Sequence, residues 1–173
     1  MRLVVISGHS GSGKTSALNI LEDVGFTCID NLPSSLLPEL INQLKPNNNP
    51  EELLLAVGVD ARNLVGDLNN FPKILTTIED SGVTVDVIFL KAHRTDLLRR
   101  YSETRRKHPL SNEMIGLKEA IDREESIISP IAKIANLTID TSSLTLHQLR
   151  DLVKNTVVPN NQQQMSILFE SFS

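Results

Sequence analysis

The chain has 173 residues, of which 40% are hydrophobic and 22% charged, and its net charge is −4. This length and composition are typical of one globular domain and exclude a chain that is disordered throughout. No apolar stretch approaches the roughly 20 residues of a membrane-spanning helix, and six aromatic side chains are too few for a platform that stacks single-stranded nucleic acid.

Short apolar runs alternate along the chain with amphipathic segments. The apolar runs predict buried strands at residues 2–7, 26–30, 53–60, 83–91 and 137–140. The amphipathic segments predict helices at residues 14–24, 33–44, 67–80, 95–107, 117–128 and 145–154. We expect Pro130 to kink or break the chain after the fifth helix. This alternation predicts an α/β fold with three α/β/α layers and a mainly parallel five-stranded sheet.

The loop after the first strand carries the most specific motif of the chain. It matches the pattern G-x-x-x-x-G-K-[ST], between a buried strand and an amphipathic helix, and therefore predicts a P-loop NTPase fold. Its glycines let several N–H groups point at one centre, where the helix N-terminus adds partial positive charge. The predicted phosphate-binding residues are Gly8, His9, Ser10, Gly11, Ser12, Gly13, Lys14 and Thr15.

Within this loop two side chains have the chemistry that phosphoryl transfer needs. Lys14 would reach the β- and γ-phosphates and act in catalysis, and the Thr15 hydroxyl would bind Mg²⁺. The expected ligand is therefore ATP or GTP with Mg²⁺.

Two aspartates follow predicted strands, at the sheet edge where α/β proteins bind ligands. Asp30 ends the second strand and Asp60 ends the third. A strand-end carboxylate can hold the metal's water shell, and Asp30 could also be a catalytic base. The alternative for each is a helix cap or a turn, which aspartate also favours. Asp86 lies in the middle of a strand and is expected to be structural.

Residues 91–107 hold seven lysines and arginines against only Asp96 and Glu103. This basic segment could form a lid that clamps phosphates, with Arg105 and Arg106 as catalytic residues. It could instead be a solvated helix in which Arg99, Glu103 and Arg106 form an exposed ladder. The excess of positive charge favours phosphate contact by some of the cations Arg94, Arg99, Arg100, Arg105, Arg106 and Lys107.

The histidines and the cysteine show no spacing typical of a structural zinc site. Cys28 is the only cysteine, so no internal disulfide can form, and we expect a reducing, cytoplasmic location. Because Cys28 lies in an apolar strand, we interpret it as an inert core residue.

Near its C-terminal end the chain changes character. Residues 156–164 are polar and contain a proline, which is typical of a linker, and residues 165–172 resume an alternating apolar pattern. That pattern predicts either a closing edge strand or the opening of a further domain. We expect residues 1–155 to form the nucleotide-binding domain and residues 156–173 to lead out of it.

Five segments together resemble the RapZ/YvcJ family of P-loop proteins along nearly the whole chain. They read GHSGSGKT, LEDVGFTCIDNLP, VDARN, RRYSETRRKHPL and LFESF. The resemblance implies ATP and GTP binding with slow hydrolysis. It implies an RNase adapter that presents a small regulatory RNA to RNase E, controls amino-sugar synthesis, and binds RNA mainly through a C-terminal domain. It also implies a second nucleotide segment, associated with GTP, at Asp60, Ala61, Arg62 and Asn63.

Three functions remain open from the sequence. The first is a regulatory nucleotide-binding module with low NTPase turnover, with or without homo-oligomer formation. The second is a small-molecule kinase that uses the P-loop, the arginine-rich lid and Asp30 as base. The third is an RNA-binding module that uses the basic segment, which predicts steep salt dependence.

Overall fold

The computed structural model describes residues 1–44, 53–61, 70–104, 107–111 and 116–157. Five parallel strands form one sheet in the order β2-β3-β1-β4-β5. The strands are β1 (Arg2–Gly8), β2 (Thr27–Ile29), β3 (Leu54–Gly58), β4 (Thr84–Lys91) and β5 (Leu137–Asp140). The predicted α/β fold with a five-stranded parallel sheet is therefore confirmed.

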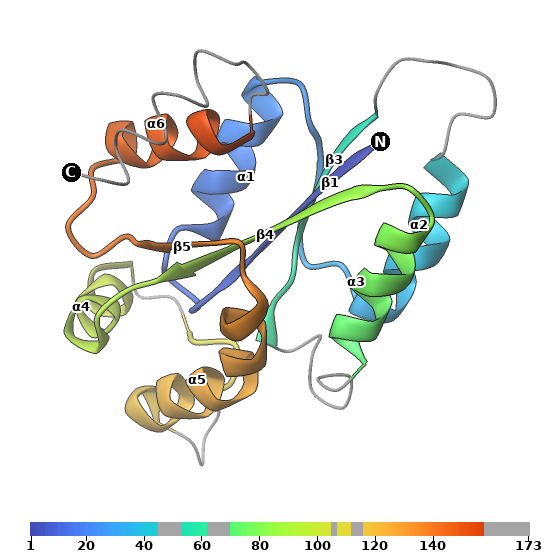
Figure 1. Cartoon of the computed structure of the whole chain (residues 1–173). Coiled ribbons are helices and arrows are strands. Elements are labelled where there is room, and N and C mark those ends of the chain that lie inside the picture. Colours follow the sequence, from blue (N-terminus) through green and yellow to red (C-terminus); the bar gives the residue numbers. More distant parts are fainter. Residues whose placement is uncertain (45–52, 62–69, 105–106, 112–115, 158–173) are drawn as a thin grey trace.

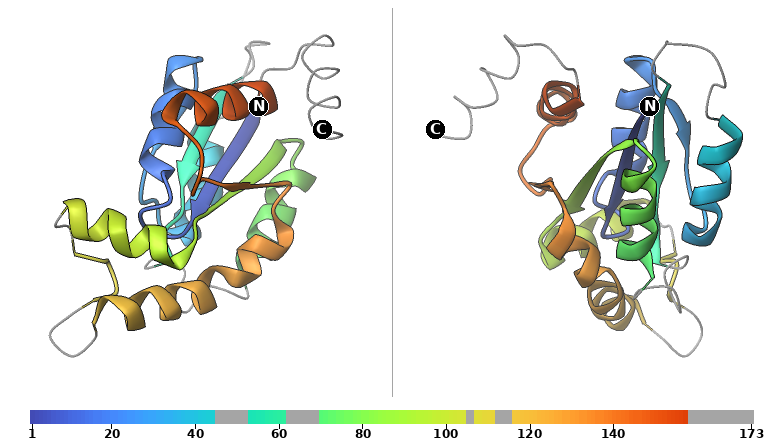
Figure 2. Two further views of the ribbon diagram at one scale, coloured as in Figure 1. Left: turned by 90° about the vertical axis from the view of Figure 1, so that its left-hand side faces the viewer. Right: turned by 45° about the vertical axis from the view of Figure 1, so that its right-hand side comes forward.

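Helices connect the strands and cover both faces of the sheet (Figure 1). They are α1 (Lys14–Asp23), the 3₁₀ turn η1 (Ser34–Leu36), α2 (Leu37–Leu44), α3 (Phe71–Asp80), α4 (Arg94–Thr104), α5 (Leu117–Ile134) and α6 (Leu146–Val157). Helices α1 and α6 lie on one side of the sheet, and α2 and α3 lie on the other (Figures 1 and 2). None of the helices in the described ranges is long and apolar enough to cross a membrane.

Alternation along β1 divides the core into two layers. Leu3 and Val5 pack with α2, α3 and the second half of α5, whereas Val4 and Ile6 pack with α1 and α6. All four side chains are fully buried. Strand β1 is thus held from both faces and from both neighbouring strands, so the loop that leaves it starts from a rigid base.

Helix α5 differs from the prediction because it continues through Pro130 to Ile134. Pro130 has no N–H to donate to the carbonyl of Ser126, one turn earlier. The Ser129 hydroxyl donates to that carbonyl at 3.3 Å instead. On the buried side Ile128 and Ile131 flank the proline within the core. Of the two predicted effects of Pro130, a break was therefore wrong: packing and a replacement hydrogen bond let the helix continue.

Several other boundaries also differ from the predictions. The expected helix at 33–44 begins as the 3₁₀ turn η1, α3 begins at Phe71, and the basic helix α4 spans Arg94–Thr104. Helix α6 runs to Val157, so the first two residues of the expected linker are helical. Val157 is buried against the α1 side of the core, which explains why the helix extends that far.

Candidate functional site

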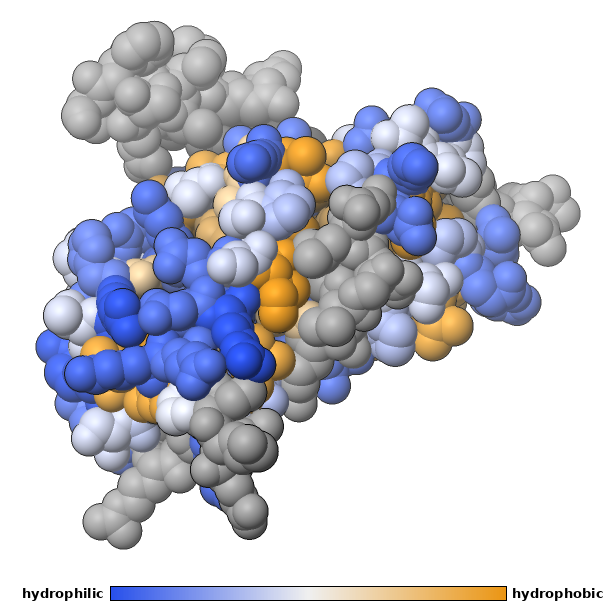
Figure 3. Space-filling view, turned by 90° about the horizontal axis from the view of Figure 1, so that it is seen from below, coloured by the Kyte–Doolittle hydropathy of each residue, from blue (hydrophilic) through white to orange (hydrophobic). Residues whose placement is uncertain are grey.

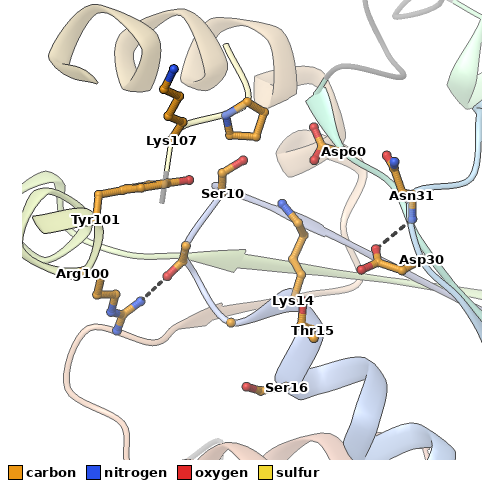
Figure 4. A pocket seen from close by; sticks show the side chains of 13 residues that line it. Ser10, Lys14, Thr15, Ser16, Asp30, Asn31, Asp60, Arg100, Tyr101 and Lys107 are labelled. Atoms are coloured by element: carbon orange, nitrogen blue, oxygen red, sulfur yellow. Dashed lines mark hydrogen bonds between the residues drawn. The ribbon is translucent and has the colours of Figure 1, made fainter. Parts of the chain in front are cut away.

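The loops that leave the carboxyl ends of the parallel strands meet at one edge of the sheet and line a pocket of about 530 Å³ (Figure 4). This is the edge at which α/β proteins bind ligands. The lining residues are Ser10, Gly11, Gly13, Lys14, Thr15, Ser16, Asp30, Asn31, Asp60, Arg100, Tyr101, Lys107 and Pro109. The pocket therefore brings together part of the predicted phosphate loop, both strand-end aspartates and part of the basic segment. Of the predicted loop residues, Gly8, His9 and Ser12 do not line it.

The phosphate loop leaves β1 in close contact with β4. The His9 N–H donates to the Leu90 carbonyl at 3.2 Å, and a Cβ on Gly8 would lie 2.0 Å from the same oxygen. Gly8 has a φ of 148°, and Gly11 and Gly13 have φ values of 88° and 107°. Glycine adopts these angles readily, whereas residues with a side chain rarely do. The close approach and the curled backbone explain why the motif needs glycine here.

The loop ends at the N-terminus of α1, whose first amides have no carbonyl acceptor within the helix. Gly13 is the N-cap and provides no side-chain cap. The Lys14 ammonium donates to the Gly8 carbonyl at 3.0 Å, so it closes the loop on itself. Free helix amides, partial positive charge and a lysine at one point form a site suited to an anionic phosphate chain.

The side of the pocket beyond Lys14 carries oxygen ligands suited to Mg²⁺ (Figure 4). The Thr15 side chain is exposed in the pocket, Asp30 follows β2 directly, and Asp60 follows β3 by two residues. Within the described ranges no three His, Cys, Asp or Glu side chains gather as a metal cage. Mg²⁺ usually takes one or two protein oxygens, water and substrate phosphates, so this arrangement fits it. The Asp30 carboxylate also accepts from the Asn31 N–H at 2.8 Å.

The cations of the basic segment have diverse roles. Arg100 donates to the Gly11 carbonyl at 2.8 Å (Figure 4). It also donates to the Thr141 carbonyl at 2.9 Å. Arg94 pairs with Asp122, and Arg99 pairs with Asp96 rather than with the expected Glu103. Lys107 lines the pocket but lies beyond the end of α4, and the predicted catalytic residues Arg105 and Arg106 lie outside the described residues.

Seen from below, hydrophilic side chains gather over the end of the molecule formed by α4 and α5 (Figure 3). Arg94, Arg99 and Glu103 are exposed there, together with Asp122 and Arg123 of α5. This face therefore carries both signs of charge.

The predicted second nucleotide segment is only partly described. Asp60 is 8% exposed and lines the pocket, whereas Ala61 is fully buried in the core between the sheet and α3. Arg62 and Asn63 lie outside the described residues.

Asp86, expected to be structural, pairs with Arg2 at 3.0 Å. Burial raises the pKa of Cys28 to about 11, and its thiol lies 3.2 Å from the Leu18 carbonyl.

Three residues that the sequence interpretation missed hold the loop from behind. The Thr141 hydroxyl, after β5, donates to the Ser12 carbonyl at 2.7 Å. Glu124 of α5 accepts from the Ser10 N–H at 2.6 Å, and His108 Nε2 lies 3.4 Å from Glu124. One signal was available: Glu124 interrupts the apolar helical stripe of Ala120, Ile121, Ile128 and Ile131.

Comparison with known proteins identifies the family. The model of the RapZ-like N-terminal domain matches residues 1–161. The chain belongs to the RapZ-like family. A nucleotide-binding protein of Cellvibrio japonicus is 51% identical over 172 residues, and one of Saccharophagus degradans is 49% identical. Each alignment covers 99% of this chain but only 58% and 59% of the two relatives, so the chain spans about three fifths of the length of these RapZ-like proteins.

Solved structures place this RapZ-like domain among P-loop folds. YorR of Bacillus subtilis, solved with phosphorylated GDP, aligns with a TM-score of 0.58 at 14% identity, covering 90% of this chain and 95% of its own. Shikimate kinase of Acinetobacter baumannii aligns with a TM-score of 0.55 at 18% identity, covering 98% and 93%. At these identities the likeness shows the fold alone. The chain is thus a member of the RapZ-like family with a P-loop, kinase-like fold.

Proposed function

We propose that this domain binds ATP and GTP with Mg²⁺ and hydrolyses them slowly, as a regulatory nucleotide module. The observation that carries the proposal is the uncapped N-terminus of α1, which opens into the pocket beside Lys14. The loop amides and Lys14 would hold the phosphates, and Thr15 with Asp30 or Asp60 would hold the metal. Bound Mg²⁺ would neutralise charge on the phosphate oxygens.

The environment of Arg100 supports slow turnover. In phosphoryl transfer an arginine accelerates the reaction when its guanidinium reaches the charge that develops on the transferred group. Arg100 instead donates to the carbonyls of Gly11 and Thr141. We infer that Arg100 shapes the loop, and that fast hydrolysis would need a cation from elsewhere.

Replacement of Lys14 tests the proposed site. Lys14→Ala should weaken binding of MgATP and MgGTP roughly ten- to hundredfold, since hydrogen bonds to charged groups contribute roughly 1.5–3 kcal/mol. Titration calorimetry with non-hydrolysable analogues measures this change. Lys73→Ala, at an exposed position on α3, is the matched control and should bind as the unmodified chain does. A folded Lys14→Ala variant with unchanged affinity for both nucleotides would refute the assignment.

A small-molecule kinase is the second candidate. Asp30, Asn31 and Asp60 line the pocket on the far side of Lys14 from Tyr101 and Lys107 (Figure 4). A carboxylate there could accept a proton from an acceptor hydroxyl. Incubation with γ-labelled ATP and a panel of sugars and hydroxy acids separates the candidates. Acceptor-independent phosphate release supports the regulatory module, and a labelled product supports the kinase.

By resemblance to the RapZ/YvcJ family, we further propose that the nucleotide state of this domain regulates a longer protein, one that presents a small RNA to RNase E. The mixed charges on the face over α4 and α5 support RNA binding mainly through other parts of such a protein. RNA binding by this domain alone should therefore be weak. Binding of a structured RNA measured at two salt concentrations tests this, because tight binding with a steep salt dependence would contradict it.

A further inference from the structure

Helix α5 brings a carboxylate into the interior behind the phosphate loop. Glu124 is 1% exposed and shares its helix face with the buried residues Ile121 and Ile128. Among the described residues only one other carboxylate side chain, that of Asp60, is buried. Burial of a carboxylate is strongly unfavourable unless hydrogen bonds compensate for the lost water.

Ser10 supplies the compensating hydrogen bonds, and His108 adds a close polar contact. The Ser10 N–H donates to Glu124 Oε1 at 2.6 Å, and the Ser10 hydroxyl donates to Oε2. His108 Nε2 lies 3.4 Å from Oε1, and both side chains are almost completely buried. The Leu110 N–H donates to His108 Nδ1 at 3.1 Å, which assigns the imidazole proton to Nε2, facing Glu124.

The protonation state of Glu124 agrees with this geometry. Burial raises the pKa of Glu124, but the neighbouring His108 and the hydrogen bonds from Ser10 outweigh burial and hold the pKa below its ordinary value. Glu124 is therefore ionised at neutral pH, and both of its oxygens act as acceptors.

The same cluster reaches the nucleotide pocket on its other side. Pro109, next to His108, lines the pocket, and the Tyr101 ring lies 5.4 Å from the His108 ring. A Cβ on Gly11 would lie 3.3 Å from the Tyr101 ring, so this ring limits the backbone of the loop. The loop is thus held behind Ser10 by Glu124 and beside Gly11 by Tyr101.

We propose that Glu124, oriented by His108, is a positioning residue. It holds Ser10 in place within the phosphate loop and so directs the amides at the start of α1 toward the bound phosphate. This role rests on the proposed triphosphate site. The Ser10 N–H is committed to Glu124, which leaves the amides at the start of α1 for phosphate. The affinity of the pocket then depends on a residue that touches no ligand.

The variant Glu124→Gln tests the role because it keeps size and shape but removes the charge. The glutamine oxygen can still accept from the Ser10 N–H, and its NH₂ group then faces the Ser10 hydroxyl, which must turn from donor to acceptor. The variant therefore replaces charge-assisted hydrogen bonds with weaker neutral ones. We expect the affinity for MgATP and MgGTP to fall about tenfold. Hydrogen exchange at the Ser10 amide should accelerate even without nucleotide. Glu119→Gln is the matched control, because Glu119 is exposed on the same helix and pairs with Arg123 at 3.3 Å. This variant should change neither the nucleotide affinity nor the exchange of the Ser10 amide.

A double-mutant cycle separates positioning from a general structural contribution. Ser10→Ala removes one hydrogen bond to Glu124 and keeps the backbone N–H. Adding Glu124→Gln to Ser10→Ala should cost less affinity than adding it to the unmodified chain, because both changes act on one cluster. Additive losses would overturn the role. If Glu124→Gln does not fold, Ser10→Ala alone decides, with a severalfold weaker affinity expected and an unchanged affinity contradicting the role.

The outcomes distinguish this inference from the proposed function. If the unmodified chain binds neither nucleotide, the proposed function is wrong and the positioning role toward a triphosphate is wrong with it. If the unmodified chain binds both nucleotides and folded Glu124→Gln binds them equally well, only the positioning role is overturned.

Discussion

At the scale of single residues, the site depends on a few backbone contacts that are too close to admit an additional side-chain atom. The approach of Gly8 to the Leu90 carbonyl joins the start of the loop to β4. Lys14 closes the other end of the loop on the Gly8 carbonyl. A side chain at position 8 would therefore disturb both the sheet and the phosphate cradle.

We expect Gly8→Ala to destabilise the domain by about 3 kcal/mol or more, because its Cβ would overlap a backbone oxygen that cannot move without shifting β4. Gly25→Ala is the matched control. Gly25 also has a positive φ, of 103°, but a Cβ there would meet nothing within 4 Å, so only the backbone strain of about 1 kcal/mol remains. Urea denaturation of both variants measures the difference, and equal losses would show that the close contact contributes nothing.

His9 adds a pH dependence at this edge. Burial, the largest influence, lowers the pKa of His9 below its ordinary value of 6.5, against the opposing charges of Glu124 and Glu125. The unfolded chain therefore binds a proton at a higher pH than the folded chain does. Stability should fall as the pH drops from about 6.5 toward the folded pKa of His9.

The variant His9→Gln, which cannot take up this proton, should show a smaller loss of stability in the same pH window. Urea midpoints measured at several pH values compare the two chains. Glu124 affects the stability of the fold at a lower pH than His9 does. Its folded pKa lies below the ordinary 4.5, so its contribution to stability is present above pH 4.5 and is lost as the pH falls through the folded pKa. Parallel curves for both chains down to pH 4.5 would contradict the assignment to His9.

At the scale of elements, α5 is the helix that most affects the site. Its second half packs against the sheet through Ile128 and Ile131, and its first half carries Glu124 to the loop. The proline between Ser129 and Ile131 would ordinarily end a helix. Because tertiary packing holds residues on both sides of the proline, the helix continues and connects the core to the phosphate loop.

Replacement of the proline should stabilise this helix. Pro130→Ala restores an N–H that can donate to the Ser126 carbonyl, and we expect a gain of roughly 1–2 kcal/mol after allowing for the greater freedom of the unfolded chain. Ser129→Ala should destabilise the unmodified chain slightly, since its hydroxyl donates to Ser126, and should have less effect in Pro130→Ala. Thermal unfolding of the two single variants and the double variant measures this, and a less stable Pro130→Ala would contradict the explanation.

At the scale of the whole molecule, the parallel sheet brings loops that are distant in sequence together at one site. The loops after β1, β2, β3 and β5 all emerge at one edge. Ser10, Asp30 and Asp60 therefore line one pocket, and Thr141 lies behind the phosphate loop, although up to 131 residues separate them. Two apolar layers, one on each face, hold the sheet that fixes this edge.

The amino-acid sequence by itself determined the elements and the loop. Each strand and helix depends on a local pattern of apolar residues. The phosphate loop depends on eight consecutive residues, and the need for its glycines and its lysine can be explained within that motif alone. For that reason the order of elements, the fold class and the place of the pocket could be predicted before any contact was known.

Only the tertiary structure decided what surrounds the loop. Whether Arg100 faces a phosphate or a carbonyl, and whether α5 continues through Pro130, depends on packing between distant segments. Ser10 and Glu124 are 114 residues apart in sequence, and no local pattern states that they meet. Glu124 indicates a structural role only once the structure shows that it is buried. On a solvated face the same carboxylate would carry no desolvation penalty and would hold no loop in place.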